Sequence, residues 1–266
     1  MYKTIDVETH FEGALQIVYL NQPETYNSLN RTMLEELLKL IKEADADEHV
    51  RCIAISGRGA AFCSGQNLKE ALHYKEELNE ERFIQRIIID YYNPLVKAIV
   101  QCKKPVIALV NGPAVGAGAM LALICDFAVA KESAYFSMAF SNIGLIPDTA
   151  GTYYLPKLVG RSLAHYWAYT GKKISTQEAL MRGLIADVFK DEEFENAALQ
   201  LLSHIAHQPT VALGLTKKAF NRAEQNNLSE QLDLESILQQ DVAETEDFLE
   251  GVQAFIEKRK PTYKGR

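Results

Sequence analysis

Short apolar stretches alternate with segments of helical periodicity along the first two thirds of the chain. Residues 52–56 and 106–110 are continuous apolar runs bounded by turn residues, and residues 13–20 alternate loosely, as strands do. Apolar residues recur at helical spacing in residues 30–44, behind a capping Asn30, and in residues 95–102. This alternation predicts an α/β fold, and the short strands with frequent Gly/Ala loops indicate a coiled, spiral arrangement.

The middle of the chain continues the alternation with shorter elements. Residues 69–92 are charged and are expected to be helical, and residues 111–118 form a loop of Gly, Ala and Pro. Residues 119–125 are an apolar helix by pattern, followed by short strands over residues 126–130 and 135–137.

The last third of the chain has a different pattern, with helical periodicity and little strand signal beyond about residue 192. Ser175 and Glu178 have the spacing of a capping box, and Thr245 can cap a final helix with an apolar face. We therefore expect an α/β core over residues 1–195 and a helical region over residues 196–266. The apolar face of the final helix suits packing on the chain's own core or on a neighbouring subunit.

Composition narrows the class of protein. The chain has 266 residues, 47% of them hydrophobic and 24% charged, with a formal net charge of -7. These values are typical of a globular protein, and the negative charge argues against a nucleic-acid partner. No apolar run reaches the length of a membrane span, no signal peptide is evident, and the four cysteines lack metal-ligand spacing. We expect a cytoplasmic protein without a metal site.

Two loops carry the candidate chemistry. Residues 62–68 (FCSGQNL) follow a predicted strand, and residues 112–119 (GPAVGAGA) lie between a strand and a helix. Small residues in such loops can leave backbone N–H groups free, and two such groups can hold an oxygen that gains charge during a reaction. Each loop alone is also explained by a tight turn that needs glycine. The pair Gly116 and Gly118 lacks the third glycine of a dinucleotide fingerprint.

The sequence resembles the crotonase (enoyl-CoA hydratase/isomerase) family along nearly its whole length. The matching stretches are AFCSGQNL (61–68), NGPAVGAGAMLALICD (111–126), FSMAFSNIGLIPDTAGTYYLPKLVG (136–160), TGKKISTQEALMRGLI (170–185) and EGVQAFIEKRK (250–260). The resemblance implies a spiral α/β core and a helical C-terminal region that builds homotrimers, commonly paired into hexamers. It also implies an acyl-CoA thioester substrate, so coenzyme A belongs to the substrate and no separate cofactor is expected.

The resemblance also implies roles for individual residues. It places the oxyanion-hole N–H groups at Cys63 and Ala117. It places contacts with CoA or substrate at Cys63, Ser64, Gly65, Gln66, Gly116, Met120, Phe140, Phe255 and Lys258. The last two are expected to reach the nucleotide end of CoA, in a neighbouring subunit. Asn67 stands where the family usually has Asp, with no clear consequence for function.

The choice of reaction depends on the acids that remain. Met120 and Phe140 occupy the positions of the two glutamates that family hydratases use, and neither can move a proton. Asp148, in the segment IPDTAG, matches the catalytic Asp of family isomerases, and the pattern is most similar to ring 1,2-epoxyphenylacetyl-CoA isomerases. We therefore expect an acyl-CoA isomerase with Asp148 as its acid/base. An apolar surrounding would raise the pKa of this Asp towards working pH.

Several alternatives stay open at this point. Asp148 also suits a turn after Pro147. The chain could be an enoyl-CoA hydratase, a dehalogenase in which the same Asp is a nucleophile, or a non-catalytic acyl-CoA binder. His73 lies in the segment that often covers the acyl cavity of the family, but a solvated helix position is expected.

Overall fold

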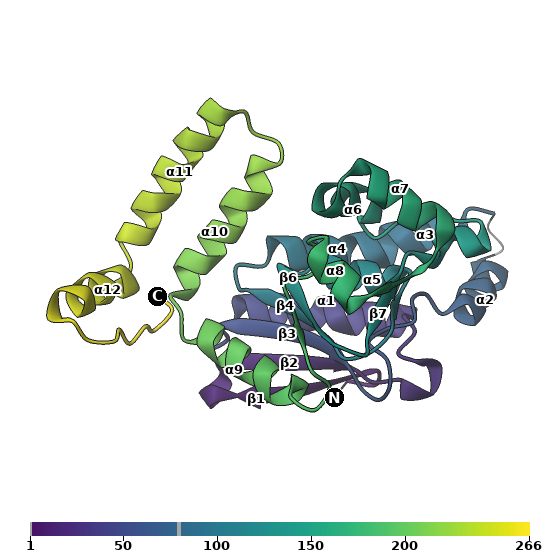
Figure 1. The fold of residues 1–266 in the computed structure, drawn as a ribbon, viewed down its shortest axis with the longest axis horizontal. Coiled ribbons are helices and arrows are strands. Elements are labelled where there is room, and N and C mark those ends of the chain that lie inside the picture. The colour runs from purple at the N-terminus through teal and green to yellow at the C-terminus, as the bar shows by residue number, and fades with distance from the viewer. Residues whose placement is uncertain (1, 79–80) are drawn as a thin grey trace.

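The computed structural model describes residues 2–78 and 81–266, and its main element is a twisted, largely parallel sheet (Figure 1). Its described strands run in the order β1-β2-β3-β4-β6-β9, and β1 pairs antiparallel with β2 while the other pairs are parallel. The strands are β1 (Ile5–His10), β2 (Leu15–Leu20), β3 (Cys52–Gly57), β4 (Val106–Val110), β6 (Phe127–Lys131) and β9 (Asp187–Phe189). The expected α/β class is confirmed, whereas β1 and β9 were not foreseen.

A second, smaller sheet lies beside the first. The described residues of this sheet are β5 (Ala114–Val115), β7 (Tyr135–Ser137) and β8 (Lys173–Ser175). Strand β5 follows β4 after only three residues and pairs with β7 instead of returning to the first sheet. The chain thus turns from one sheet into the other within residues 111–116, the loop that the sequence singles out.

Helices cover both faces of the main sheet. Alternate residues of each strand face opposite sides, so Ile53 and Ile55 pack towards α1 and α4, whereas Cys52 and Ala54 pack towards α9. The described helices before α9 are α1 (Arg31–Ala46), α2 (Leu68–Leu78), α3 (Phe83–Ile87), α4 (Asn93–Gln101), α5 (Ala117–Leu123), α6 (Gly151–Val159), α7 (Arg161–Thr170) and α8 (Thr176–Met181).

The N-caps expected from sequence are present, with one difference. Asn30 accepts a hydrogen bond from the Met33 N–H at the start of α1. At α8, the Ser175 side chain accepts from the Glu178 N–H, but the Glu178 carboxylate receives Lys172 instead of completing a capping box. The Lys172 ammonium competes for that carboxylate because a charge-assisted bond is stronger than one from a backbone N–H.

The charged segment 69–92 is broken into pieces rather than forming one helix. Helix α2 ends at Leu78, residues 79–80 lie outside the described residues, and α3 runs directly into a π-helical turn, Ile88–Tyr92. A π-turn inserts an extra residue and so rotates the side chains that follow it, and such turns are frequent at functional sites. Here the turn delivers Tyr92 into the interior, where it is buried.

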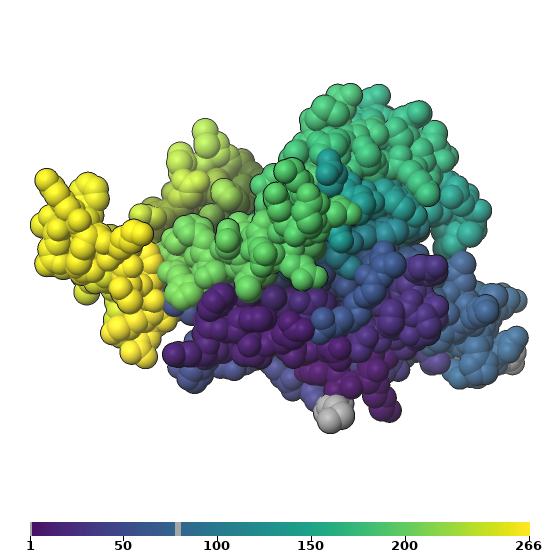
Figure 2. Space-filling view, turned by 60° about the horizontal axis from the view of Figure 1, so that its bottom comes forward, coloured from purple at the N-terminus to yellow at the C-terminus, as the bar shows by residue number. Residues whose placement is uncertain are grey.

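The last helices divide into one that belongs to the core and three that extend from it. Helix α9 (Phe194–Ala206) buries a face of Phe194, Ala198 and Leu202 against the main sheet. Helices α10 (Thr210–Ala223), α11 (Leu228–Ala243) and α12 (Glu246–Glu257) form an arm that projects from the body (Figures 1 and 2). The boundary expected after residue 195 falls inside α9, and burial favours one between α9 and α10.

The arm is anchored where α10 meets the core. The Lys217 Nζ lies 2.9 Å from an Asp126 carboxylate oxygen and also donates to the backbone oxygen of Ile99. Arg51 donates to the backbone oxygens of Gln208 and Tyr263, which holds both the start of α10 and the C-terminal tail. The base of the arm is therefore fixed, while α11 and α12 expose large apolar side chains.

The described residues contain neither a membrane-spanning helix nor a cluster of metal-ligating side chains. No helix in residues 2–78 and 81–266 is long and apolar enough to cross a membrane. In the same residues, no group of three or more His, Cys, Asp or Glu side chains could hold a metal ion.

Candidate active site

A cavity of about 230 Å³ lies where the two candidate loops meet. Seven of the residues that the sequence singles out line it, namely Ser64, Gly65, Gln66, Gly116, Ala117, Phe140 and Asp148. The rest of its wall is mainly aliphatic, from α2, α3 and the segment after β7. A larger hollow of about 1350 Å³ between α10 and the core contains none of the expected site residues. The smaller cavity is therefore the candidate active site.

The backbone N–H groups of the first loop are almost all used within the fold. The Cys63 N–H donates to the Pro113 oxygen at 3.1 Å, the Ser64 N–H to Tyr26 and the Asn67 N–H to Leu29. The Gly65 N–H faces the Cys63 sulfur at 3.5 Å. Within residues 63–67 of the described chain, the Gln66 N–H is the group without an acceptor.

The prediction that Cys63 supplies an oxyanion-hole N–H is therefore wrong. Its N–H and C=O are both engaged in a short parallel bridge to the second loop, since the Val115 N–H donates back to the Cys63 oxygen at 2.9 Å. Cys63 is fully buried and does not line the cavity, so a direct contact with CoA is excluded in this structure as well. Burial raises the pKa of the Cys63 thiol to about 12, which keeps it a neutral packing group.

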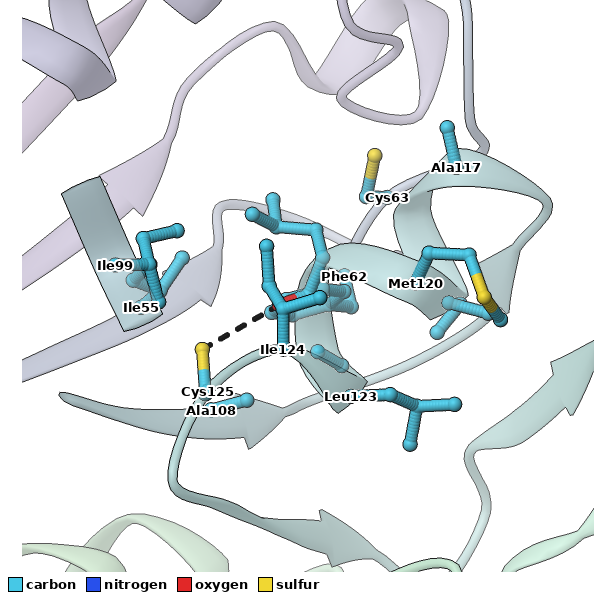
Figure 3. Packing of buried hydrophobic residues seen from close by; sticks show 14 of the residues in the cluster. Ile55, Phe62, Cys63, Ile99, Ala108, Ala117, Met120, Leu123, Ile124 and Cys125 are labelled. Atoms are coloured by element: carbon cyan, nitrogen blue, oxygen red, sulfur yellow. Dashed lines mark hydrogen bonds between the residues drawn. The ribbon is translucent and has the colours of Figure 1, made fainter. Parts of the chain in front are cut away.

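Close approach between the two loops explains their small residues. A Cβ atom on Gly118 would lie 2.3 Å from the Cys63 oxygen, and one on Gly65 would lie 2.8 Å from the Val115 oxygen. Figure 3 shows Cys63 next to Ala117 at the start of α5. Gly65 also has a φ of +94°, which places the following residue, Gln66, on the cavity wall.

The second loop contributes a free N–H group at Ala117. The Val115 and Gly116 N–H groups are bound to Cys63 and Ser137, and the Met120 N–H returns to Gly116. Ala117 is the first residue of α5, where backbone N–H groups lack intrahelical partners, and it lines the cavity. The Ala117 nitrogen lies 3.5 Å from the position that a Cβ on Gly65 would take. Gln66 and Ala117, the two residues of these loops with free N–H groups, thus line the same small cavity.

Asp148 is held by a strained turn at the edge of this space. Thr149 and Ala150, which follow it, have φ values of +51° and +63°, a left-handed conformation that is unfavourable for residues with a Cβ and especially for a β-branched one. Strain of this kind is found mainly at functional sites. The Thr149 hydroxyl donates to the Asp148 carboxylate at 2.9 Å, and the Gly151 N–H binds the Asp148 backbone oxygen.

The surroundings of Asp148 shift its acidity. Burial raises the pKa of the Asp148 carboxyl above its usual value, and the hydrogen bond from Thr149 opposes this effect without cancelling it. No other carboxylate among the described residues lines the cavity. Asp148 is therefore the group in this wall with both the position and the raised pKa of a general base.

Met120 and Phe140 lie in different places. Phe140 lines the cavity beside Asp148, as expected. Met120 does not line the cavity, because it is buried on α5 (Figure 3). Its sulfur fills the space beside Gly151, where an added Cβ would lie 2.4 Å from it. The expectation that Met120 contacts substrate is therefore wrong, because Gly151 at the start of α6 leaves room for its side chain in the core.

The remaining predicted residues are placed as follows. The Asn67 side chain accepts a hydrogen bond from the Glu70 N–H and so caps α2, a role that an Asp could fill equally well. His73 is exposed and faces Glu77, as expected for a solvated position. Phe255 and Lys258 lie at the exposed end of α12 and do not line the cavity of their own chain.

Two features of the site are not predicted from the sequence, namely the free N–H group of Gln66, which is expected only as a CoA or substrate contact, and the position of Tyr92. Gln66 follows the left-handed Gly65, and a residue just after such a turn often keeps its N–H free, which was the available signal. Tyr92 lines the cavity and donates from its hydroxyl to the Gln66 Oε1 at 2.5 Å. Nothing in the periodicity of residues 83–92 distinguishes it from Tyr91, because the π-turn that buries it has no clear sequence signature.

Comparison with known proteins agrees with this geometry. The family model for enoyl-CoA hydratase/isomerase matches residues 10–266. The chain belongs to the enoyl-CoA hydratase/isomerase family. Members of this family act on acyl-CoA thioesters, and the crotonase resemblance seen in the sequence is confirmed.

Relatives in the enoyl-CoA hydratase/isomerase family are named as enzymes of different reactions. The chain is 41% identical over 258 residues to the 1,2-epoxyphenylacetyl-CoA isomerase of Escherichia coli (strain K12), covering 97% of this chain and 98% of that one. It is 42% identical over 265 residues to a Rhodobacter capsulatus protein named "Probable enoyl-CoA hydratase", covering 100% and 99%. The crystal structure of enoyl-CoA hydratase from Bacillus anthracis has a TM-score of 0.92 at 34% identity, covering 99% and 100%.

Proposed function

We propose that the protein is an acyl-CoA isomerase that moves a double bond, or opens a ring epoxide, in the acyl group of a CoA thioester. The observation that carries the proposal is that Asp148, with its raised pKa, is the one carboxylate that the described residues place on the cavity wall. The positions of the hydratase glutamates hold Met120, which lies in the core, and Phe140. The similarity to an epoxyphenylacetyl-CoA isomerase supports the same reaction class.

The proposed oxyanion hole consists of the Gln66 and Ala117 N–H groups. Both lack acceptors within the described chain, and both residues line the cavity. A thioester oxygen between them gains negative charge when a neighbouring C–H bond is broken. Preorganised N–H donors at that point stabilise the enolate, and removal of one such donor costs about 10²–10³ in kcat in other enzymes.

A single carboxylate is sufficient for moving a double bond. In a 3-enoyl thioester, the Asp148 carboxylate takes a proton from the carbon next to the carbonyl, and the electrons of that C–H bond form the enolate. The protonated Asp148 then gives the proton to the far carbon of the double bond, while the enolate electrons restore the carbonyl and form the new double bond. No atom or electron is gained or lost, so the step needs no further reactant.

The test is a panel of three ester types: a 3-enoyl-CoA, a ring-epoxide CoA ester and crotonyl-CoA, each followed by product identification. We expect an isomerised product from the 3-enoyl or ring-epoxide ester and very slow hydration of crotonyl-CoA. Fast hydration of crotonyl-CoA would show that a hydratase is the better description, as the name of the Rhodobacter relative suggests. Tight binding with no turnover on any ester would instead indicate a non-catalytic acyl-CoA binder.

The arm supports a second proposal, a homotrimer or a hexamer of paired trimers. Phe255 is 85% exposed and Ile256 68% exposed on α12, which is more apolar surface than an isolated helix end usually presents. In such an assembly, Phe255 and Lys258 would meet the nucleotide end of a neighbour's CoA. Light scattering on Phe255→Asp tests this: the wild type is expected at three or six times the mass of the chain, and the variant below it. A monomeric wild type would refute the assembly.

A further inference from the structure

Tyr92 is a buried polar group that the proposed chemistry leaves without a role. It is 3% exposed, it ends the π-helical turn, and it lines the cavity together with Asp148. Among the described lining residues it is the one titratable group besides Asp148. Burial raises the pKa of its hydroxyl well above the usual value, and the nearby charge of Asp148 acts in the same direction, so the hydroxyl stays protonated and able to donate.

The partner of this hydroxyl is the residue that carries half of the proposed oxyanion hole. Tyr92 donates to the Gln66 Oε1 at 2.5 Å, and the Gln66 Nε2 in turn donates to the Asn67 backbone oxygen at 3.2 Å. The Gln66 side chain is therefore held at both polar ends. On either side of Gln66, the Leu29 N–H donates to the Gly65 oxygen, and the Asn67 N–H donates to the Leu29 oxygen. Neither bond uses the Gln66 N–H, which stays free.

We infer that Tyr92 is a positioning residue, which fixes the direction of the Gln66 N–H in the oxyanion hole through its hydrogen bond to the Gln66 side chain. The inference rests on the proposed function only in requiring that the Gln66 N–H binds the thioester oxygen. Gly65 gives the loop a freedom that most residues lack, since its φ is +94°. The bond from Tyr92 restricts the loop at the next residue, where a small rotation of the peptide would turn the N–H away from the oxygen.

The first variant is Tyr92→Phe, which keeps the ring and removes the hydroxyl. On a 3-enoyl-CoA ester we expect kcat to fall about tenfold while KM changes less than about twofold, because the hole acts on the transition state more than on the bound ester. Gln66→Leu removes the acceptor from the other side and keeps the backbone N–H, so it should give a similar loss. The double variant should have about the same kcat as the less active of the two single variants, because both substitutions remove the same hydrogen bond.

The matched control is Tyr91→Phe. Tyr91 precedes Tyr92 on the same turn, but its ring contacts Tyr74 and it does not line the cavity. Its kcat should stay at the wild-type value. Equal losses in Tyr91→Phe and Tyr92→Phe would show a general effect on the turn and would overturn the inference.

A second measurement reports on the hole without turnover. Butyryl-CoA labelled with ¹³C at the carbonyl binds but cannot be isomerised, and infrared difference spectra give its carbonyl stretch. Two N–H donors should shift this stretch to lower frequency in the wild type, and Tyr92→Phe should show a smaller shift. A full shift retained in Tyr92→Phe would overturn the role of Tyr92 alone, whereas no shift in the wild type would overturn the hole and this inference together.

Discussion

The two walls of the cavity are built from different kinds of chemical group. On one wall, Gln66 and Ala117 have free backbone N–H groups, the Ala117 side chain is small, and the Gln66 side chain is engaged in hydrogen bonds of the fold. On the other wall, Asp148 and Phe140 present side chains, and Asp148 sits before two strained residues. With the proposed oxyanion hole, the first wall would stabilise any thioester enolate, because its two N–H groups would bind only the carbonyl oxygen.

The difference separates what a family shares from what distinguishes its members. A backbone hole depends on loop geometry, which relatives with different reaction names can keep at 41% or 42% identity. The second wall depends on which side chain carries a proton. The proposed reaction of this chain is therefore determined by few residues, and substitutions on the two walls should have different consequences.

Asp148→Asn should give the largest loss of activity and should leave the wall formed by Gln66 and Ala117 unchanged. The amide cannot take a proton, so we expect isomerase activity to fall by about 10²–10⁴-fold. Because Asn keeps an oxygen for the Thr149 hydroxyl, binding of butyryl-CoA should stay within about twofold of the wild type. Initial rates and isothermal titration calorimetry measure both quantities. Full activity in this variant would place the acid/base elsewhere.

Gly65→Ala should damage the other wall. The added Cβ would lie 2.8 Å from the Val115 oxygen in a backbone conformation of positive φ, so the two loops must separate and the hole must widen. We expect kcat to fall by about 10²–10³-fold. The ¹³C carbonyl shift of bound butyryl-CoA should decrease in parallel.

Gly183→Ala is the control for this variant. Gly183 also has a positive φ, of +74°, but it lies beyond α8 and an added Cβ would meet the Leu158 oxygen at an ordinary 3.7 Å. Its kcat should remain unchanged, although the protein loses about 1–2 kcal/mol of stability to the left-handed conformation. Equal kcat losses in the two variants would show that strain, and not loop separation, disables the enzyme.

The sequence predicts the two walls to different extents. The Gly-rich loops and the Asn30 cap are visible because local composition specifies them, whereas Asp148 is singled out through the resemblance to family isomerases, since its local pattern equally suits a turn after Pro147. The choice of Cys63 for a free N–H is wrong because this N–H donates to the oxygen of Pro113, which is 50 positions away in the sequence, and nothing local shows that the N–H is used. Met120 is misplaced for a similar reason, since only the packing against Gly151 takes it into the core.

The pH at which kcat/KM falls on the acid side should depend on the apolar residues around Asp148, of which Phe140 is one. Asp148 must be ionised to take a proton, so kcat/KM should fall with decreasing pH at values above the usual Asp pKa of about 3.9. Phe140→Gln adds a polar group to the cavity and should move this limb to lower pH. Ile146→Gln is the control, because Ile146 is 74% exposed and does not line the cavity. A limb that moves equally in both variants would exclude desolvation by Phe140 as its cause.

The smallest expected effect is on stability, and its sign distinguishes a catalytic carboxylate from a structural one. Burial raises the pKa of Asp148 in the folded protein, so between the unfolded and folded pKa values the folded protein holds more protons than the unfolded chain. Stability therefore falls as pH rises through that window and stays lower above it. Asp148→Asn removes this cost and should unfold at a higher urea concentration than the wild type at pH 7, with the difference disappearing below about pH 4.

Asp126 provides the opposite case within the same molecule. Burial also raises the pKa of its carboxyl, but Lys217 lies 2.9 Å away and anchors α10. Lys217→Met leaves the Asp126 carboxylate, whose side chain is 23% exposed, without its ion-pair partner, so it should destabilise the protein at pH 7, by up to about 3–5 kcal/mol. Asp126 would then hold the arm on the core, whereas Asp148 would be kept at a cost in stability because the proton transfer needs it. Two losses of equal size at pH 7 would remove this distinction and make Asp148 a structural residue of its turn.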